Sequence, residues 1–293
     1  MITGAYDVAA RGAHAAQPRL LEAWRRLLIA RAHDDTARSA GRSCVVVAPH
    51  PDDETLGCGA TIARKRAAGT DVTVVVVADG RYAQRQSSIV TPADLAEIRA
   101  TELLAACRAL GVADADIVQL RHEDTFVDRV VDDVASTLHE LIARKRPREI
   151  LVCSGLDHHP DHRAVNRAVH RAVRAATSDV TGVRPPPQVR EYPVWSWIDG
   201  PWLDQRQRTP LGRAMHLVGD PLTSLRRGRP DVVATGEFLP AKRAALAAHA
   251  SQTTRLTDEP DWAVMDGGML DLFLGDVEVF LTGSPIDRRT QRC

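Results

Sequence analysis

Two apolar runs, each followed by a helical pattern, constrain the fold of this chain more than any other feature. The segment CVVVA begins at Cys44, and the segment VTVVVVA begins at Val72. Near-continuous runs of β-branched residues are typical of parallel strands that helices cover on both faces. Two further predicted strands, 114–120 and 148–155, alternate with helical patterns in the same way. The chain is therefore expected to be α/β, with a Rossmann-like, mostly parallel sheet and helices on both faces.

The first 42 residues are expected to form a helical extension outside the main domain. Residues 18–35 carry apolar side chains at helical spacing, and a polar connector of small residues follows them. These apolar residues are Leu20, Leu21, Trp24, Leu27 and Leu28.

Residues 43–293 are expected to form a single domain. Within it, residues 198–229 are rich in Arg and Pro, show no clear period, and are interpreted as an insertion or lid. Residues 184–200 are interpreted as a proline-stiffened loop that enters an aromatic-rich strand. A helix over 240–252 and a final strand over 276–283 complete the domain.

The composition argues against several classes of partner. Lys and Arg together number 38, as do Asp and Glu, so the net charge is zero and gives no case for binding nucleic acid or an anionic membrane. No apolar run approaches the roughly 18–20 residues that span a bilayer. The start of the chain lacks a signal-peptide core, and the five cysteines form no C-x-x-C pair. A cytoplasmic protein with buried, reduced thiols is expected, and a homo-oligomer is left open.

A cluster of polar residues follows the first apolar run directly. His50, Asp52, Asp53 and Glu54 lie within five residues of one another. Three carboxylates beside a histidine repel one another unless a positive charge lies between them, and a metal ion would supply that charge. The alternative is an acidic cap at the start of a helix, which the helix dipole favours.

A second cluster, DHHPDH, follows the fourth predicted strand. It contains His158, His159 and His162, and Pro160 fits the first turn of a helix, so that His159 and His162 lie one turn apart. Because parallel strands end at the same edge of a sheet, both clusters are expected to form one site. Two imidazoles and a carboxylate are the ligands of a hydrolytic zinc site, and Asp52 beside them is placed to act as a base.

These motifs resemble the PIG-L/LmbE-like family of zinc-dependent N-acetylglucosamine deacetylases. The residues that carry the resemblance are PHPDDE at 49–54 and HPDH at 159–162. Weaker matches are R-x-x-E, from Arg99 to Glu102, and K-x-x-A-L-x-x-H-x-S-Q over 242–252. The resemblance extends from Ser43 to Gly283 and omits the N-terminal helix.

The resemblance implies a role for each motif residue. The zinc ligands would be His50, Asp53 and His162, with Asp52 as general base. His159 would stabilise the tetrahedral intermediate, and Asp161 would orient His159. The candidates for contacting substrate are Arg99, Asp124 and His249.

The implied function is removal of an N-acyl group, most simply acetyl, from a glucosamine-containing substrate by attack of metal-bound water. One alternative is an amidase or tailoring deacylase acting on a larger conjugate or natural product. An alternative of another class is a catalytically silent sugar-binding module, against which the presence of both Asp52 and His159 counts. A nucleotide-sugar transferase is disfavoured, because the acidic loop would repel phosphate.

The sequence also departs from the family pattern. Family members often have Thr-x-Gly-Glu after the second strand, where this chain has Ala78-Asp79-Gly80-Arg81. Members that act on glucosaminyl-inositol tend to have a tyrosine shortly before HPDH, where this chain has Asp157 and His158. These differences leave hydrolysis intact and argue against a small inositol-linked substrate.

Other conspicuous residues have structural interpretations beside functional ones. Cys58 is interpreted as a small buried filler rather than a nucleophile. Three histidines are expected on the surface: His122, His139 and His170. Stacking on a sugar and packing in a core or lid are equally open for Trp195, Trp197 and Trp202.

Overall fold

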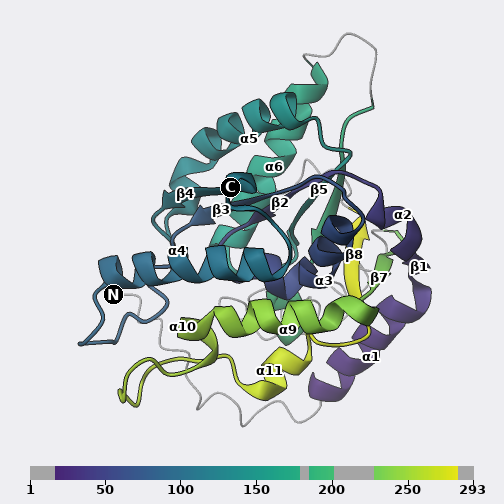
Figure 1. Ribbon diagram of the computed structural model, residues 1–293. Helices are drawn as coiled ribbons and strands as arrows, with labels where there is room; N and C mark the ends of the chain where they lie inside the picture. Colours follow the sequence, from purple (N-terminus) through teal and green to yellow (C-terminus); the bar gives the residue numbers. More distant parts are fainter. Residues whose placement is uncertain (1–16, 179–184, 201–227, 283–293) are drawn as a thin grey trace, which may run out of the picture.

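Eight strands form one mixed sheet in the part of the chain that the computed structural model describes, residues 17–178, 185–200 and 228–282 (Figure 1). Their order across the sheet is β1-β7-β8-β6-β5-β2-β3-β4. All neighbouring pairs are parallel except those of β8 with β6 and β7. The strands are β1 (His33–Asp34), β2 (Cys44–Ala48), β3 (Val72–Ala78), β4 (Ile117–His122), β5 (Glu149–Cys153), β6 (Gln188–Tyr192), β7 (Asp231–Ala234) and β8 (Val277–Thr282).

Helices cover both faces of the sheet (Figure 1). One layer contains α3 (Asp53–Ala67), α4 (Pro92–Ala109) and α9 (Leu239–Ala248), and the other contains α5 (Val131–Lys145) and α6 (Pro160–Ser178). The remaining helices are α1 (Gln17–Arg31), α2 (Thr36–Ala40), α7 (Trp195–Asp199), α10 (Ala250–Thr253) and α11 (Gly267–Asp271), with 3-10 turns η2 (Asp114–Asp116), η3 (Val127–Val130) and η5 (Gly236–Phe238).

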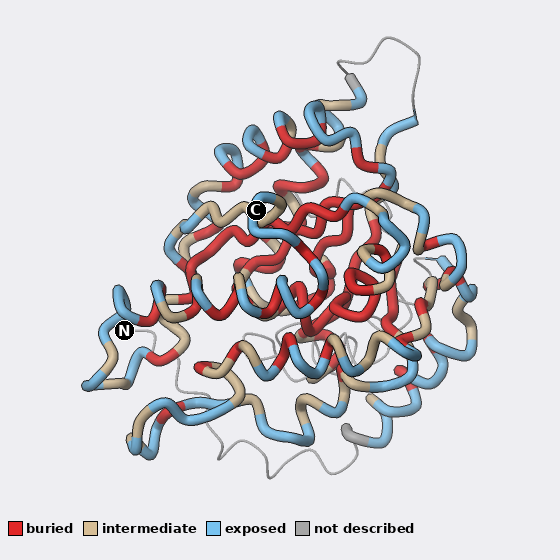
Figure 2. Tube along the Cα trace, viewed as in Figure 1, coloured by how far each residue is buried: buried red, intermediate tan, exposed pale blue. Residues whose placement is uncertain are grey.

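The core lies between the two helical layers and confirms the predicted α/β class. Every residue of β2, β3 and β5 is buried, and the buried segments form the centre of the molecule in Figure 2. A strand that is covered on both faces has no solvent-facing side, which is why its sequence is a near-continuous apolar run.

The order of the strands creates a switch point between β2 and β5. From β2 the chain proceeds through β3 to β4 on one side, and it then returns to place β5 and β6 on the other side of β2. The loops that leave β2 and β5 therefore diverge at the carboxyl edge, where doubly wound sheets bind their ligands. These are the two loops that carry the polar clusters.

Three predictions about local structure are wrong. The N-terminal segment is not helical throughout, because it adds β1, which pairs with β7 through the backbone. The aromatic segment is only partly a strand, since β6 follows the prolines but ends at Tyr192, and Trp195 and Trp197 lie in α7. His170 is not on the surface, because α6 presents it to the sheet, where Nε2 lies 3.3 Å from Glu191.

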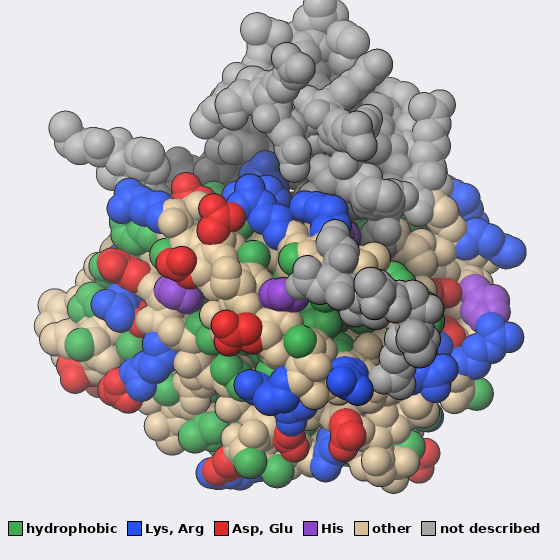
Figure 3. All heavy atoms as spheres, turned by 90° about the horizontal axis from the view of Figure 1, so that it is seen from above, with side chains coloured by type: hydrophobic (Ala, Val, Ile, Leu, Met, Phe, Trp, Pro, Cys, Tyr) green, Lys and Arg blue, Asp and Glu red, His purple; other side chains and the backbone are tan. Residues whose placement is uncertain are grey.

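The surface and the cysteines agree with an ordinary globular domain. Basic and acidic side chains are interspersed on the face shown in Figure 3. None of the helices in the described residues combines the length and apolar character that crossing a bilayer requires. Cys44, Cys58, Cys107 and Cys153 are buried free thiols.

Most of the predicted lid, residues 201–227, lies outside the described residues, as does Trp202.

A buried network of charges lies at the edge of the sheet opposite the two polar loops. Arg190 is fully buried and contacts Asp35 at 2.8 Å and Asp231 at 2.9 Å. Arg42 also pairs with Asp35, and it contacts Glu149, the first residue of β5, at 2.6 Å. The network thus ties the segment between β1 and α2 to the amino ends of the central strands.

We expect Asp35→Asn to destabilise the fold by up to about 3 kcal/mol, because it removes the buried carboxylate that Arg42 and Arg190 share and leaves each with one fewer ionic partner. Burial alone would raise the pKa of Asp35, but Arg42 and Arg190 hold it below its ordinary value. The stabilisation is therefore complete above a pH of about 4 and is lost as the pH falls through the lowered pKa. Denaturant unfolding of wild type and variant should show a difference that shrinks in acid. Asp34→Asn, on an exposed neighbouring carboxylate, should unfold like wild type, and a similar loss there would contradict the assignment.

Candidate metal centre

The two polar loops meet at the carboxyl edge of the sheet, as the sequence predicts. His50 follows β2, Asp53 begins α3, and His162 lies in the first turn of α6. The Asp53 Oδ2 atom lies 3.3 Å from His50 Nδ1 and 3.3 Å from His162 Nε2. The three potential ligand atoms lie within 4.8 Å of one another.

This spacing fits a tetrahedral metal ion. Ligand atoms that surround zinc at about 2.0–2.1 Å in tetrahedral geometry lie about 3.3–3.4 Å from one another. The distances from Asp53 Oδ2 to His50 Nδ1 and to His162 Nε2 both match this separation between ligand atoms. In addition, His162 Nε2 is buried and has no hydrogen-bond partner among the described residues. A buried nitrogen without a partner is costly, and a metal bond would satisfy it.

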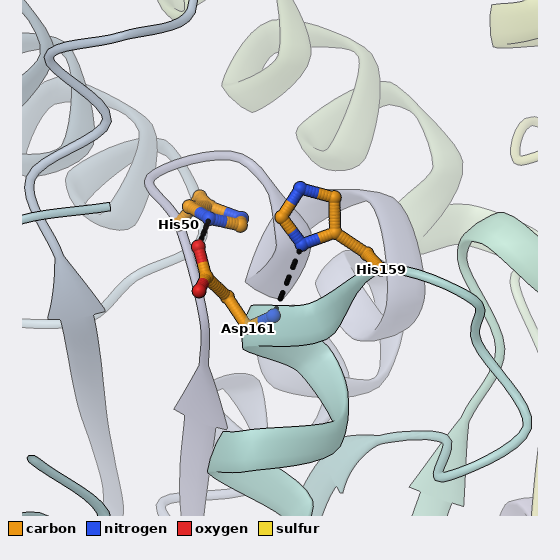
Figure 4. Close-up of side chains that lie close together, drawn as sticks. All are labelled: His50, His159 and Asp161. Carbon is orange, nitrogen blue, oxygen red and sulfur yellow. Dashed lines mark hydrogen bonds and ion pairs between the residues drawn. The ribbon is translucent and has the colours of Figure 1, made fainter. Parts of the chain in front are cut away.

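A second group of possible ligands shares His50. Figure 4 shows His50, His159 and Asp161 side by side, with His50 Nε2 3.1 Å from Asp161 Oδ2. That oxygen already accepts a hydrogen bond from the Thr125 backbone at 2.6 Å, and His159 Nδ1 accepts one from the Asp161 backbone at 3.3 Å. Asp53 Oδ2 also accepts a hydrogen bond, from the His50 backbone at 3.0 Å, but only the group of His50, Asp53 and His162 contains a buried ring nitrogen without a hydrogen-bond partner among the described residues, so it suits a metal better.

The carboxylates of Asp53 and Asp161 favour positive charge on His50 and His162 or between them. Burial by itself lowers the pKa of His50, but Asp161 and Asp53 raise it to about 9. Burial also lowers the pKa of His162, but Asp53 and other neighbours raise it well above its ordinary value. Conversely, burial would raise the pKa of Asp53, yet His162 and His50 hold it far below its usual range. A metal ion would replace the protons that these imidazoles otherwise hold, so that its binding would release protons.

Asp52 is oriented by strained backbone and by an arginine. Its φ is 140°, and its side chain makes no capping hydrogen bond to α3, so the explanation as an acidic cap does not hold. Instead, Arg99 Nη2 lies 3.0 Å from Asp52 Oδ2. Burial, assisted by Asp53 and opposed by Arg99, raises the pKa of Asp52 to about 6. A base with a pKa near neutrality suits proton transfer at physiological pH.

Glu54 and His249 hold the backbone beneath Asp52. Glu54 accepts a 3.0 Å hydrogen bond from the Asp52 backbone and lies 3.1 Å from His249 Nε2. Burial would raise the pKa of Glu54, but His249 lowers it, and Glu54 in turn raises the pKa of His249 against its burial. Both side chains are fully buried, so this pair supports the loop of Asp52 from within the protein.

The three residues predicted to contact substrate are all buried. Arg99 is 3% exposed and donates to the backbone oxygens of Gly80 and Pro51 as well as to Asp52. His249 is buried against Glu54. Asp124 accepts hydrogen bonds from the Tyr82 backbone and is 7% exposed. The first two residues therefore lie behind Asp52.

Asp161 does not orient His159 as predicted. Its carboxylate contacts His50, and only its backbone N–H reaches His159 (Figure 4). The reason is local geometry, because residues two positions apart at the start of a helix do not face each other. With Nδ1 of His159 accepting that bond, the ring proton lies on Nε2.

Two contacts at the site were not predicted. Asp157 Oδ2 lies 2.9 Å from His162 Nδ1, and the Trp195 ring stacks on His159 with centroids 6.1 Å apart. Asp157 lies two residues before the HPDH motif in the sequence, and this nearness could have indicated a contact with a motif histidine. The position of Trp195 depends on α7, which was predicted as a strand.

Comparisons with known proteins agree with the site. The family model described as PIG-L: GlcNAc-PI de-N-acetylase matches residues 45–173. A 1D-myo-inositol 2-acetamido-2-deoxy-alpha-D-glucopyranoside deacetylase from Thermobispora bispora is 31% identical over 270 residues, covering 78% of this chain and 84% of that protein.

Solved structures share the fold at low sequence identity. The zinc-inhibited form of teicoplanin deacetylase Orf2 has a TM-score of 0.58 and 20% identity, covering 81% of this chain and 96% of that one. A 4-carboxy-2-hydroxymuconate hydratase, GalB from Pseudomonas putida KT2440, has the same TM-score of 0.58 at 17% identity, covering 84% and 98%. The fold alone therefore does not determine the reaction. The match in sequence and in both motifs does decide the family: the chain belongs to the PIG-L family of deacetylases.

Proposed function

We propose that this protein hydrolyses the acetamide of an N-acetylglucosamine-containing small molecule, with zinc held by His50, Asp53 and His162. The observation that carries the proposal is the convergence of two imidazole nitrogens on Asp53 Oδ2 at 3.3 Å each, with Asp52 next in the chain. Zinc bound there would polarise the amide carbonyl and lower the pKa of a water molecule.

Asp52 is the general base in this proposal. Its carboxylate takes a proton from the attacking water as the new C–O bond forms, and it delivers the proton to the departing nitrogen when the C–N bond breaks. Because burial raises the pKa of the Asp52 carboxyl to about 6, the same group can accept and release a proton near neutral pH. Arg99 keeps the carboxylate directed at the site through its 3.0 Å contact.

His159 stabilises the oxyanion that forms at the carbonyl oxygen. Burial, together with His50 and His162, lowers the pKa of His159 to about 2, so the ring is neutral in this arrangement. Because Nδ1 accepts a hydrogen bond from the Asp161 backbone, Nε2 carries the proton and can donate it. A neutral donor at this position supports the oxyanion without giving up its proton.

The amino-sugar substrate is supported by the relatives, since one is named as a deacetylase of an inositol-linked 2-acetamido-2-deoxy-glucopyranoside and another as a teicoplanin deacetylase. Asp124, which is largely buried at the edge of the site, is proposed to contact the sugar. Buried free thiols support a reducing compartment, the cytoplasm.

The test is a measurement of acetate and free amine released from a panel of N-acetylglucosaminides. The panel should contain the inositol-linked sugar, N,N'-diacetylchitobiose and an acetylated glycopeptide, each with zinc-loaded protein. We expect equimolar acetate and amine from at least one of them, and no release after chelation. Release of neither product from any member of the panel would contradict the proposal.

A further inference from the structure

Asp157 joins a proposed metal ligand to a helix that follows much later in the chain. Its carboxylate is fully buried and accepts hydrogen bonds from His162 Nδ1 at 2.9 Å and Ser196 Oγ at 2.6 Å. The backbone N–H groups of Ser196, at 2.8 Å, and Val194, at 3.2 Å, donate to the same carboxylate. Asp157 therefore fixes the start of α7 and the ring of His162 at the same time.

This contact determines which nitrogen of His162 is free for a metal. A carboxylate of this kind only accepts hydrogen bonds, so the proton of the His162 ring lies on Nδ1. In the neutral ring that a metal requires, Nε2 then offers its lone pair on the side of Asp53, 3.3 Å away. Without Asp157 the ring could turn or change its tautomer, and the ligand geometry would be lost.

The same helix contacts the second histidine of the motif. Trp195, the first residue of α7, stacks on His159 with an interplanar angle of 15°. Adjacent residues of one short helix thus limit the movement of His159 and, through Asp157, of His162.

The N-terminal helix α1 supports α7 from its other end. Arg25 Nε donates to the Trp197 backbone oxygen at 2.7 Å, and Arg25 Nη2 donates to that of Ile198 at 3.3 Å. The last carbonyl groups of a helix have no partner within the helix, and here Arg25 supplies one. The rings of Trp24 and Trp197 also contact, with centroids 5.9 Å apart.

We propose that α7, anchored by Asp157 and supported by Arg25 of α1, is a positioning element that holds His162 and His159 in their working orientation. This inference rests on the proposed function. Both helices lie outside residues 45–173, which the family model matches. The N-terminal extension thereby contributes to the metal centre without touching the metal ligands.

The first test measures zinc affinity of the full-length Asp157→Asn variant by competition with a chromophoric chelator. Loss of the partner of a metal-binding histidine weakens metal binding by about 10–100-fold, and this is the expected change in Kd. Asp35→Asn serves as the matched control, because it also removes a buried carboxylate but lies at the opposite edge of the sheet. It should lower stability and leave zinc affinity unchanged.

The second test compares Arg25→Met with Arg26→Met on the same helix. Arg26 is exposed and pairs with Glu22 on the surface. We expect a several-fold weaker zinc affinity and a lower kcat for Arg25→Met, partial recovery in Arg25→Lys, and wild-type values for Arg26→Met. Wild-type zinc affinity in both Asp157→Asn and Arg25→Met would overturn the inference. Absence of zinc binding by the wild type itself would instead overturn the proposed function.

Discussion

Replacing Asp52 with alanine is expected to leave the metal content unchanged while kcat falls by about 10²–10⁴-fold, the usual contribution of a general base. The expectation follows from the position of Asp52, which lies beside the proposed ligands but faces Arg99 at 3.0 Å. Its strained backbone, with φ of 140°, is held by Glu54 and aims the carboxylate away from the helix that follows. Steady-state acetate release and elemental analysis on the same preparation measure both quantities.

The neighbouring carboxylate provides the control. Asp53→Ala should lose metal and turnover together, whereas Asp52→Ala should lose turnover alone. Thermal unfolding of both variants without metal establishes that each is folded. Turnover within tenfold of wild type in Asp52→Ala would remove this residue from the mechanism.

Replacing His159 with alanine is expected to lower kcat by about 10²–10³-fold with little change in KM, because the ring acts on charge that develops only in the transition state. The low pKa of His159, about 2, predicts a neutral donor across the working pH range. The fall in kcat should therefore be similar below and above neutral pH. Metal content should be unchanged, since Nδ1 accepts a backbone hydrogen bond and the ring lies outside the proposed ligand set.

The preceding histidine is the matched control for this variant. His158 faces Asp199 at 3.7 Å and has a side chain that is 28% exposed. His158 contacts α7 through Asp199 and the Trp195 ring, so His158→Ala should lower kcat through α7 but by at least tenfold less than His159→Ala. Equal losses in the two variants would show that the effect comes from the loop rather than from an oxyanion contact.

The sheet and its two polar loops could be predicted from the sequence because both signals are local. Each central strand is a near-continuous apolar run, and each cluster follows such a run within a few residues. Once the strands are parallel, their ends meet without further information. The pairing of β2 with β5 then brings His50 and His162 together although more than a hundred residues separate them.

The rest depended on contacts that leave little local signal. β1 is two polar residues held by backbone pairing, and α7 is too short for its period to distinguish a helix from a strand. The burial of His170 and the turn of Arg99 toward Asp52 follow from how helices pack on the sheet. The family pattern identified Arg99 and Asp161 as important, but it could not specify which atoms they contact.

The most direct test of a shared metal centre is the metal content of the purified, chelator-free protein beside Asp53→Ala and His162→Ala. Elemental analysis should find about one zinc per chain in wild type and almost none in either variant, since each removes one of three ligands. That result would show that the loops after β2 and β5 hold one ion between them. Wild-type protein that contains no metal and takes up none from added zinc would contradict this arrangement, as would variants that retain a full complement.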